Sequence, residues 1–271
     1  MEKKLFIVAI FLFLSTSLFA KQISLAEGEE KLNALFQKLK KEESDSIKRC
    51  VNDSICQIFS SLLQKKNTFE YPFQELKYIG KRIAKDRKVA IYTWSYPENG
   101  GAKYSGIVQQ KTPKGVRVLP LKQATKAYAP KEIGTISTQN WYGALYFDIV
   151  PFRSKHGKVY MLLGIAQNKQ FLTMKVIDVL WFEEEKAFLG MPIFEFWKKD
   201  FLHRIVFEYN EDISITLLYE KENKRFVFDH LEPVNSGFVG DYRYYVPNST
   251  YDAYKKNVWK WVLQEDVIVG E

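Results

Sequence analysis

The sequence has few of the side chains that metal centres and nucleophilic enzymes use. It contains only two cysteines and three histidines in 271 residues. A structural zinc site usually takes four cysteine or histidine ligands in closely spaced pairs. Cys50 and Cys56 form one pair, and no second pair follows nearby. No histidine stands beside either cysteine, so a thiol nucleophile lacks the base that would activate it. We therefore expect no metal site.

Three motifs with a known catalytic mechanism are also absent. The sequence has no Gly-x-Ser-x-Gly nucleophile elbow, no glycine-rich phosphate loop and no His-Glu-x-x-His pair. We therefore expect no bound cofactor, and the sequence favours a protein without catalytic activity.

Long apolar runs are missing except at the N-terminus, where LFIVAIFLFL spans residues 5–14. Charged residues 2–4 precede this run and STSLFA, ending at Ala20, follows it, which is the pattern of a secretory signal peptide over residues 1–20. The run is shorter than the ~20 residues of a spanning helix, so a retained anchor is the less favoured alternative. No cysteine precedes Cys50, so this is not a lipoprotein pattern. We expect an exported protein, periplasmic or extracellular, with no stable membrane insertion after cleavage.

Basic residues outnumber acidic ones, and the formal net charge is +8. Residues 1–20 hold two lysines and one glutamate, so the mature chain would carry +7. A basic protein can attract anionic surfaces, but these lysines are spread along the chain and no arginine-rich arm occurs. We expect a solvated basic surface and no nucleic-acid partner.

Two apolar series with helical spacing follow the predicted signal peptide. They lie on either side of the charged stretch 38–46 and comprise Leu32, Leu35, Phe36, Leu39, Ile47, Val51, Ile55, Ile58, Phe59 and Leu62. Ser44 and Asp45 suit the start of a new helix. We predict a helical segment over residues 21–68, either a hairpin or one long kinked helix.

Both cysteines fall within the second helical series. Six residues along a continuous helix advance about 9 Å, whereas a disulfide needs its two Cα atoms within about 7 Å. Cys50 and Cys56 should therefore stay free of each other if the helix is continuous. An internal bond would require a break near Asn52.

From Phe69 onward the hydrophobic period changes to two. Alternating runs such as KVAIYTWSY (88–96) and KVYMLLGIAQ (158–167) are separated by turn clusters such as PENGG (97–101). The short connections leave little room for crossover helices. We predict a mainly β fold with an N-terminal helical segment, in which residues 69–271 form an antiparallel β-rich domain with a meander order. A curled sheet, a sandwich or an incomplete propeller would each fit.

Several motifs in this region follow one another in a characteristic order. They are FEYPFQELKYI (69–79), IYTW (91–94), WYGALYFDI (141–149), KVIDVLWF (175–182), FDHLEP (228–233) and YRYYVPNSTYDAY (242–254). In this order they resemble an uncharacterised family of secreted, β-rich proteins from Bacteroidota-type bacteria. The resemblance implies export and gives no catalytic residue to carry over. The chain departs from the family pattern at Lys85–Arg87 and at Asn248, where relatives tend to carry Ser-x-Asp-Gly and an aspartate.

The stretch FVFDHLEP combines acids and a base. Its catalytic candidates are Asp229, His230 and Glu232. Side chains alternate along a strand, so Asp229 and His230 should point to opposite faces of the sheet and cannot act jointly. Pro233 cannot donate to a ladder, so the strand should end near Leu231. We favour structural roles, with Asp229 bonded to Arg225 or to turn amides and His230 capping the aromatic face.

Aromatic and acidic residues elsewhere are candidates for ligand binding. Trp94 and Trp141 could stack on sugar rings, and Asp252 interrupts a strand-like run. The aspartates that could pair as acid and nucleophile of a glycosidase, about 5–9 Å apart, are Asp148, Asp178, Asp229 and Asp252. An aspartate at a strand end more commonly bonds turn amides. In WKW, Trp259 and Trp261 share one face by alternation, which we interpret as core.

Three functions of different classes follow from these patterns. We favour a secreted or periplasmic, non-enzymatic binding or envelope-associated protein whose partner is a glycan or a protein. The alternatives are a glycan hydrolase that uses paired Asp or Glu, and an accessory or inhibitor subunit that docks through the N-terminal helices. A cleft with two carboxylates beside an exposed tryptophan would favour the hydrolase. An exposed apolar stripe along residues 32–39 would favour docking.

Overall fold

The computed structural model describes residues 23–65, 67–125, 128–197 and 200–269. The predicted signal peptide, residues 1–20, lies outside the described residues. The fold is mainly β with two N-terminal helices, as predicted, and its sheets are antiparallel with one exception. In the described part of the chain, no helix has the length and apolar character to cross a bilayer.

The N-terminal segment forms a helical hairpin, so of the two predicted forms the single kinked helix does not occur. Helix α1 (Leu25–Lys41) begins at a capping box, in which the Ser24 hydroxyl accepts from Glu27 N and the Glu27 carboxylate accepts from Ser24 N. It ends at Glu42, and α2 (Asp45–Leu63) starts after a short turn. The predicted apolar stripe of α1 is buried, which leaves it unavailable as an exposed docking face.

Helix α2 runs without a break past both cysteines. Cys50 and Cys56 are free thiols in the structure. This agrees with the expectation that a continuous helix keeps the two side chains apart.

The first sheet contains β1 (Gly80–Ile83), β2 (Val89–Glu98), β3 (Gly101–Thr112) and β4 (Gly115–Lys122), paired antiparallel in chain order. The second sheet has the order β5 (Ile136–Ser137), β9 (Lys186–Leu189), β8 (Leu172–Glu183), β7 (Gly157–Lys169) and β6 (Leu145–Ser154). Strand β12 (Ile205–Asn210) pairs with the first half of β8, while β9 pairs with its second half. The first sheet and strands β6 to β9 of the second follow the predicted meander, whereas β5 and β12 pair out of chain order, with β9 and β8.

The third sheet has the order β11 (Asp200–Leu202), β10 (Phe194–Trp197), β16 (Lys260–Gln264), β15 (Tyr245–Asn257), β14 (Arg225–Pro233) and β13 (Leu217–Glu220). Its β10–β16 pair is parallel. In this pair β16, near the end of the sequence, lies beside a strand from much earlier in the sequence. The meander prediction did not anticipate this pair. Three short 3₁₀ turns complete the described elements: η1 (Thr138–Asn140), η2 (Ser236–Phe238) and η3 (Tyr242–Tyr244).

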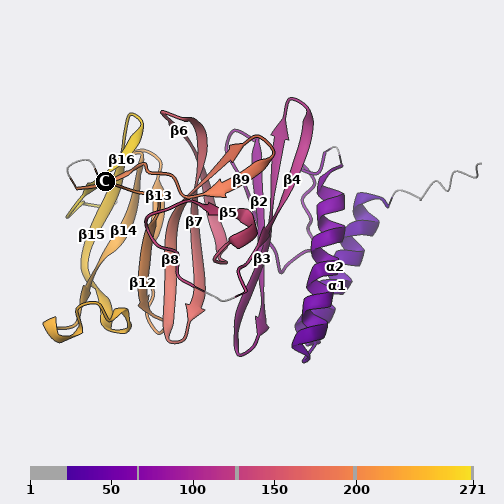
Figure 1. The fold of residues 1–271 in the computed structure, drawn as a ribbon, viewed down its shortest axis with the longest axis horizontal. Coiled ribbons are helices and arrows are strands. Elements are labelled where there is room, and N and C mark those ends of the chain that lie inside the picture. Colours follow the sequence, from indigo (N-terminus) through magenta and orange to yellow (C-terminus); the bar gives the residue numbers. More distant parts are fainter. Residues whose placement is uncertain (1–22, 66, 126–127, 198–199, 270–271) are drawn as a thin grey trace, which may run out of the picture.

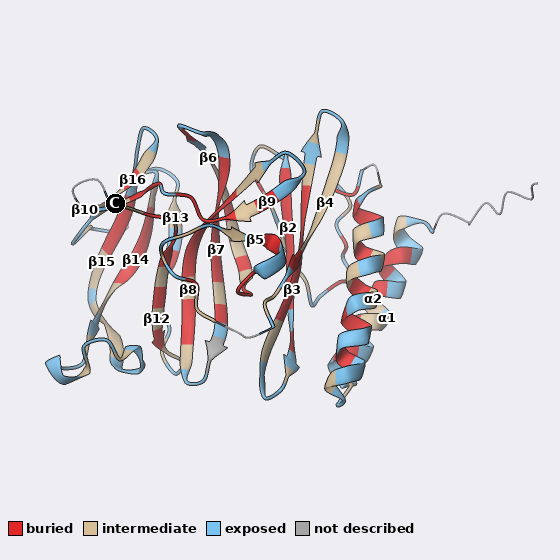
Figure 2. Ribbon diagram, viewed as in Figure 1, coloured by how far each residue is buried: buried red, intermediate tan, exposed pale blue. Residues whose placement is uncertain are grey.

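The elements stack as four layers, with the helical hairpin at one end followed by the first, second and third sheets (Figure 1). One apolar core lies between each pair of layers. Strand β7 contributes to two of these cores. Its Leu162 faces the core shared with the first sheet, whereas Met161 and Leu163 face the core shared with the third. The second sheet, which contains β7, is therefore buried on both faces (Figure 2). Of the three architectures left open by the sequence, the stacked sheets correspond best to a sandwich.

A buried ion pair ties the second sheet to the segment that precedes β5. Arg204 Nε donates to Asp178 Oδ2 at 3.2 Å, and both side chains are almost fully buried. The other guanidinium nitrogens donate to backbone carbonyls of Lys131, Gly134 and Leu189. All the charge of this pair is thus satisfied inside the protein, and Asp178 is not available as a catalytic carboxylate.

Candidate functional site

The two tryptophans predicted as ligand contacts are core residues. Trp94 and Trp141 are 1% and 0% exposed. The indole of Trp94 donates to Asn52 Oδ1 at 2.9 Å, and that of Trp141 donates to the Tyr146 hydroxyl at 3.0 Å. Neither ring can stack on a ligand, so this binding hypothesis does not fit the structure. Alternation along a strand is compatible with a tryptophan on either face. The sequence therefore could not decide whether these two indoles are buried or exposed.

The tryptophans of WKW separate instead of sharing the core. Trp261 is buried, whereas Trp259 is 47% exposed. The reason is local, since the β15–β16 turn includes Val258 with φ of +48° and Trp259 precedes β16. Strand alternation does not apply to Trp259, so the core prediction for it was wrong.

The FVFDHLEP stretch does not gather its own acids around its histidine. Asp229 Oδ2 accepts from Thr216 N at 2.5 Å. A β-bulge lies between Asp229 and Leu231, and the exposed Glu232 follows it. Arg225 pairs with Glu220 and not with Asp229. Asp229 thus bonds a backbone amide, the second of the two structural roles expected for it.

His230 bonds Asp252 instead. In the sequence, His230 is a catalytic candidate and Asp252 a binding candidate, and nothing there connects the two. His230 Nδ1 lies 2.7 Å from Asp252 Oδ2, and Asp252 Oδ1 accepts from Asp266 N at 3.1 Å. The pair therefore joins β14, β15 and the segment after β16. In the described residues no serine, threonine or cysteine side chain bonds the His230 ring, so the nucleophile that a catalytic His–Asp pair would activate is not in place.

Strand β14 continues through Pro233, two residues beyond the predicted end. Pro233 pairs with Tyr245 of β15, whereas β13 covers the other edge of β14 only from Arg225 to Phe228. The missing N–H of Pro233 therefore falls where β14 is an edge strand, and no ladder bond is lost.

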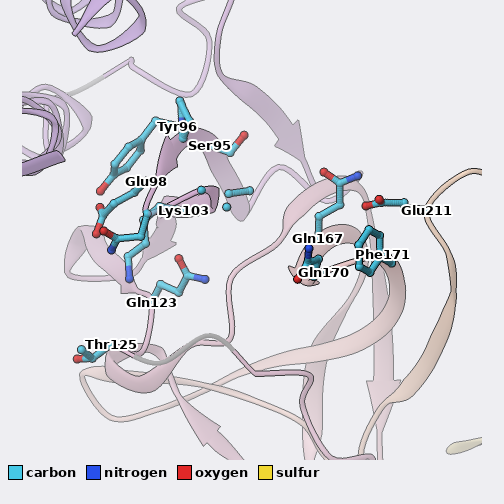
Figure 3. Close-up of a pocket in the computed structure, with 15 residues that line it drawn as sticks. Ser95, Tyr96, Glu98, Lys103, Gln123, Thr125, Gln167, Gln170, Phe171 and Glu211 are labelled. Atoms are coloured by element: carbon cyan, nitrogen blue, oxygen red, sulfur yellow. The ribbon is translucent and has the colours of Figure 1, made fainter. Parts of the chain in front are cut away.

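A polar cleft of about 1060 Å³ lies between the β2–β3 hairpin and the β7–β8 turn (Figure 3). Its lining comes from segments far apart in the chain: Ser95, Tyr96, Pro97, Glu98, Asn99, Gly100, Gly101, Ala102, Lys103, Gln123, Thr125, Gln167, Gln170, Phe171 and Glu211. Sequence reasoning named PENGG only as a turn and proposed none of these side chains as a site. We call this hollow the polar cleft.

Local backbone rules build the first wall of the polar cleft. Asn99 and Gly100 form a two-residue hairpin loop between the paired residues Glu98 and Gly101, and both have positive φ, at 52° and 73°. This is the favoured loop for tightly twisted hairpins, and Asn-Gly is its preferred sequence. Glu98 and Lys103, on either side of this turn, lie together on this wall of the cleft (Figure 3).

The opposite wall carries an exposed aromatic ring. Phe171, in the β7–β8 turn, has φ of +63° and is 53% exposed. Its carbonyl accepts from Glu211 N at 3.2 Å, which joins the turn to the segment after β12. A phenylalanine in the left-handed region and open to solvent is unusual on both counts. Figure 3 shows Phe171, Gln167 and Glu211 together on this wall.

Glu98 is the electrostatic feature that stands out in the polar cleft. Its side chain is only 8% exposed, and its Oε2 makes no hydrogen bond of good geometry among the described residues, although the Tyr96 hydroxyl interacts with the carboxylate. Its Oε1 lies 3.6 Å from Arg49 Nη1, too far for a hydrogen bond. Burial first, and the neighbouring Glu98 charge second, raise the pKa of Tyr96. A buried carboxylate oxygen without a good hydrogen bond is costly, so this position suits an incoming donor.

A smaller hollow of about 400 Å³ adjoins the polar cleft and shares Tyr96, Lys103 and Gln123 with it. Helix α2 supplies its other side, which includes Asp53 and Cys56. Burial first, and Asp53 second, raise the pKa of the Cys56 thiol to about 12. A thiol that stays protonated is a poor nucleophile. In the described part of the chain no three His, Cys, Asp or Glu residues are grouped so as to hold a metal ion.

Comparison with known proteins adds no relative from which a role could be transferred. No family model matches the chain, and searches of curated proteins and of solved structures give no significant match. The chemistry of the polar cleft therefore carries the functional argument.

Proposed function

We propose that this chain is an exported, non-enzymatic binding protein and that its ligand is a neutral glycan held in the polar cleft. The observation that carries the proposal is the buried Glu98 carboxylate in the lining of the cleft, whose Oε2 makes no hydrogen bond of good geometry in the described structure and can still accept one. A sugar hydroxyl that donates to it would satisfy the carboxylate. The signal-peptide pattern of residues 1–20 supports export.

The remaining lining supports a polyhydroxylated ligand. The cleft presents three side-chain amides, from Asn99, Gln167 and Gln170, while the fourth amide in its lining, that of Gln123, bonds the backbone of Tyr104 and Tyr142. Each amide group can both donate and accept, as each sugar hydroxyl can. Phe171 adds an exposed apolar surface for the C–H face of a sugar ring.

Charge in the cleft does not favour an anionic ligand. Two carboxylates, Glu98 and Glu211, line it against one ammonium group, that of Lys103. The Lys103 ammonium already donates to the Ala124 carbonyl at 3.3 Å. Because Arg49 pairs with Glu98, the charges of Glu211 and Lys103 balance, and the cleft offers no net attraction to nucleic acids or acidic glycans.

The experiment is a glycan-array screen of the mature chain, residues 21–271, followed by calorimetric titration of each neutral glycan that binds. Glu98→Gln keeps the shape and removes one acceptor oxygen, so we expect an affinity loss of about tenfold or more, since a hydrogen bond to a charged group contributes about 1.5–3 kcal/mol. Glu232→Gln, which changes an exposed carboxylate outside the cleft, is the matched control. Failure of every neutral glycan to bind, or unchanged affinity in Glu98→Gln, would overturn the proposal.

A second candidate function, glycan hydrolysis, is favoured by one observation. Glu98 and Glu211 line the same cleft from opposite walls (Figure 3), and a hydrolase needs two such carboxylates. Incubation of the mature protein with each bound glycan separates the two functions. New reducing ends that disappear in both Glu98→Gln and Glu211→Gln would identify a hydrolase, whereas a glycan recovered intact supports binding alone.

A further inference from the structure

The connection between β14 and β15 is a loop rich in aromatic and glycine residues. Residues 234–245, with the sequence VNSGFVGDYRYY, are called the aromatic loop here. Val239 is 72% exposed, and Tyr242 and Tyr244 are about two-fifths exposed. Large side chains gathered in the open on one loop mark an interaction site more often than a structural feature.

The aromatic loop is held in one shape by its own bonds. Phe238 N donates to Asn235 O at 3.1 Å, and Gly240 N donates to the Tyr245 hydroxyl at 3.1 Å. The rings of Phe238 and Tyr244 stack with their centroids 3.9 Å apart. Rings positioned before a ligand arrives avoid most of the ordering cost of binding.

The loop also neutralises its own charge. Arg243 donates to both carboxylate oxygens of Asp241, at 2.8 and 2.6 Å. This bonding lowers the pKa of the Asp241 carboxyl. The exposed tyrosines therefore stand beside a closed ion pair, which offers no net attraction to an anionic polymer or an anionic membrane.

Two hydrogen bonds connect the aromatic loop to the wall of the polar cleft. Asn210 Nδ2 donates to the Arg243 carbonyl at 3.0 Å, and the next residue, Glu211, lines the cleft. Glu211 N in turn donates to the Phe171 carbonyl. The loop, the β7–β8 turn and the β2–β3 hairpin all lie at the lower end of the layers in Figure 1.

We propose that these parts form one extended surface for a polymeric neutral glycan, with the chain of sugars running from the polar cleft over Phe171 to Tyr242 and Tyr244. This inference rests on the proposed function of the cleft. Tyrosine suits the role because its ring packs on the apolar face of a sugar while its hydroxyl bonds the rim. Each further sugar unit in contact adds binding energy without a second association cost.

A protein partner would use the same loop differently. A stable protein interface covers about 800 Å² on each partner and has an apolar centre. Here the apolar side chains are interspersed with Asn235, Gly237 and Gly240, and the surface continues into a cleft lined by amides. These features favour the glycan over a protein partner.

The test uses the mature chain and neutral glucan, xylan, mannan and chitin oligosaccharide ladders, from disaccharide to octasaccharide, titrated by calorimetry. For the ladder that binds, we expect wild-type affinity to rise about tenfold or more with length, the equivalent of about 1.4 kcal/mol. The double variant Tyr242→Ala/Tyr244→Ala should lose this rise and keep the affinity for the shortest binding member. The variant Tyr242→Phe/Tyr244→Phe, which retains both rings, should keep most of the rise and shows that the loop still folds.

The outcomes separate this inference from the proposal on which it rests. Absence of binding at every length would overturn the proposed function itself. Binding that depends on Glu98 but is independent of length would overturn only the extended surface. Binding that rises with length equally in wild type and in the double alanine variant would also overturn it, because the aromatic loop would then take no part in glycan binding.

Discussion

At the scale of single residues, the buried charges of this protein fall into two groups. Asp178 and Arg204 are buried together, and each charged atom of the guanidinium has an acceptor. Glu98 is nearly as well buried, yet one of its oxygens makes no hydrogen bond of good geometry in the described structure. Buried polar groups are hydrogen-bonded in the great majority of cases. We therefore interpret the Asp178–Arg204 pair as structural and Glu98 as a residue that can bind a ligand.

Replacing Arg204 by Met should be strongly destabilising. The change leaves Asp178 charged and unpaired in the core and removes the donors of three backbone carbonyls. We expect the free energy of unfolding to fall by about 3–5 kcal/mol, measured by urea titration. Arg87→Met, at the exposed Arg87–Glu70 pair, should cost less than about 1 kcal/mol. Equal losses in the two variants would contradict the structural role of Arg204.

The two thiols should differ in reactivity. Cys50 is exposed, whereas burial raises the pKa of Cys56 to about 12, so at pH 8 almost no thiolate forms at Cys56. Iodoacetamide should therefore label Cys50 in the native protein and leave Cys56 largely unmodified, as read by peptide mass spectrometry. After denaturation without reductant both should be labelled. A disulfide-linked peptide would argue against the continuous helix α2, and equal native labelling would contradict the burial of the Cys56 thiol.

At the scale of elements, the β14 bulge decides what the FVFDHLEP stretch does. The register of β14 against β15 shifts between Asp229 and Leu231, and His230 pairs with Asp252. Asp252 then holds the backbone of Asp266, beyond the last strand. The result is a tie between three segments of the third sheet, and Asp229 takes no part in it.

His230→Ala should weaken this tie without affecting ligand binding. The His230 side chain is 40% exposed, so we expect a loss of about 1–2 kcal/mol in the free energy of unfolding. Glycan affinity should be unchanged and metal content should stay at background. His156→Ala, in an exposed turn, is the control and should change stability by less than about 0.5 kcal/mol. Stoichiometric zinc or calcium in the wild type that is lost in His230→Ala would make this pair a metal site.

At the scale of the whole molecule, the helical hairpin is one of four layers and not a separate domain. Phe59 of α2 packs against Tyr92 of the first sheet with ring centroids 5.0 Å apart. Trp94 donates to Asn52 of α2. The sequence boundary at residue 68 therefore marks a change of secondary structure within a continuous core.

Removal of residues 21–64 should prevent the rest of the chain from folding in soluble form. The deletion uncovers Tyr92, Trp94 and Ile107, which the helices bury in full. An exposed apolar sheet face promotes aggregation. We expect the truncated chain to be insoluble or to lack a cooperative thermal transition, whereas removal of residues 21–22 alone should leave the transition unchanged. A soluble, cooperatively folding truncated chain would show two independent domains.

What the sequence determined by itself is the local structure. The spacing of Leu32, Phe36 and Leu39 predicted a helix, period-two runs predicted strands, and six-residue spacing kept the two thiols apart. These predictions held because periodicity records which side of an element is buried, and both helices bury one apolar face. The same logic could not say that Trp94 and Trp141 are inside, since alternation assigns residues to a face without saying what covers that face.

Only the tertiary structure decided the parallel β10–β16 pair, the His230–Asp252 contact and the polar cleft. Asp252 lies twenty-two positions beyond its partner, and the cleft takes side chains from segments between Ser95 and Glu211. Its lining comes from strand ends and turns, where alternation does not show which side chains face the same space. The sequence marked PENGG as a turn because local backbone preferences are encoded locally. That the turn faces Phe171 across a space, with a buried carboxylate oxygen that makes no hydrogen bond of good geometry, depends on how the layers stack.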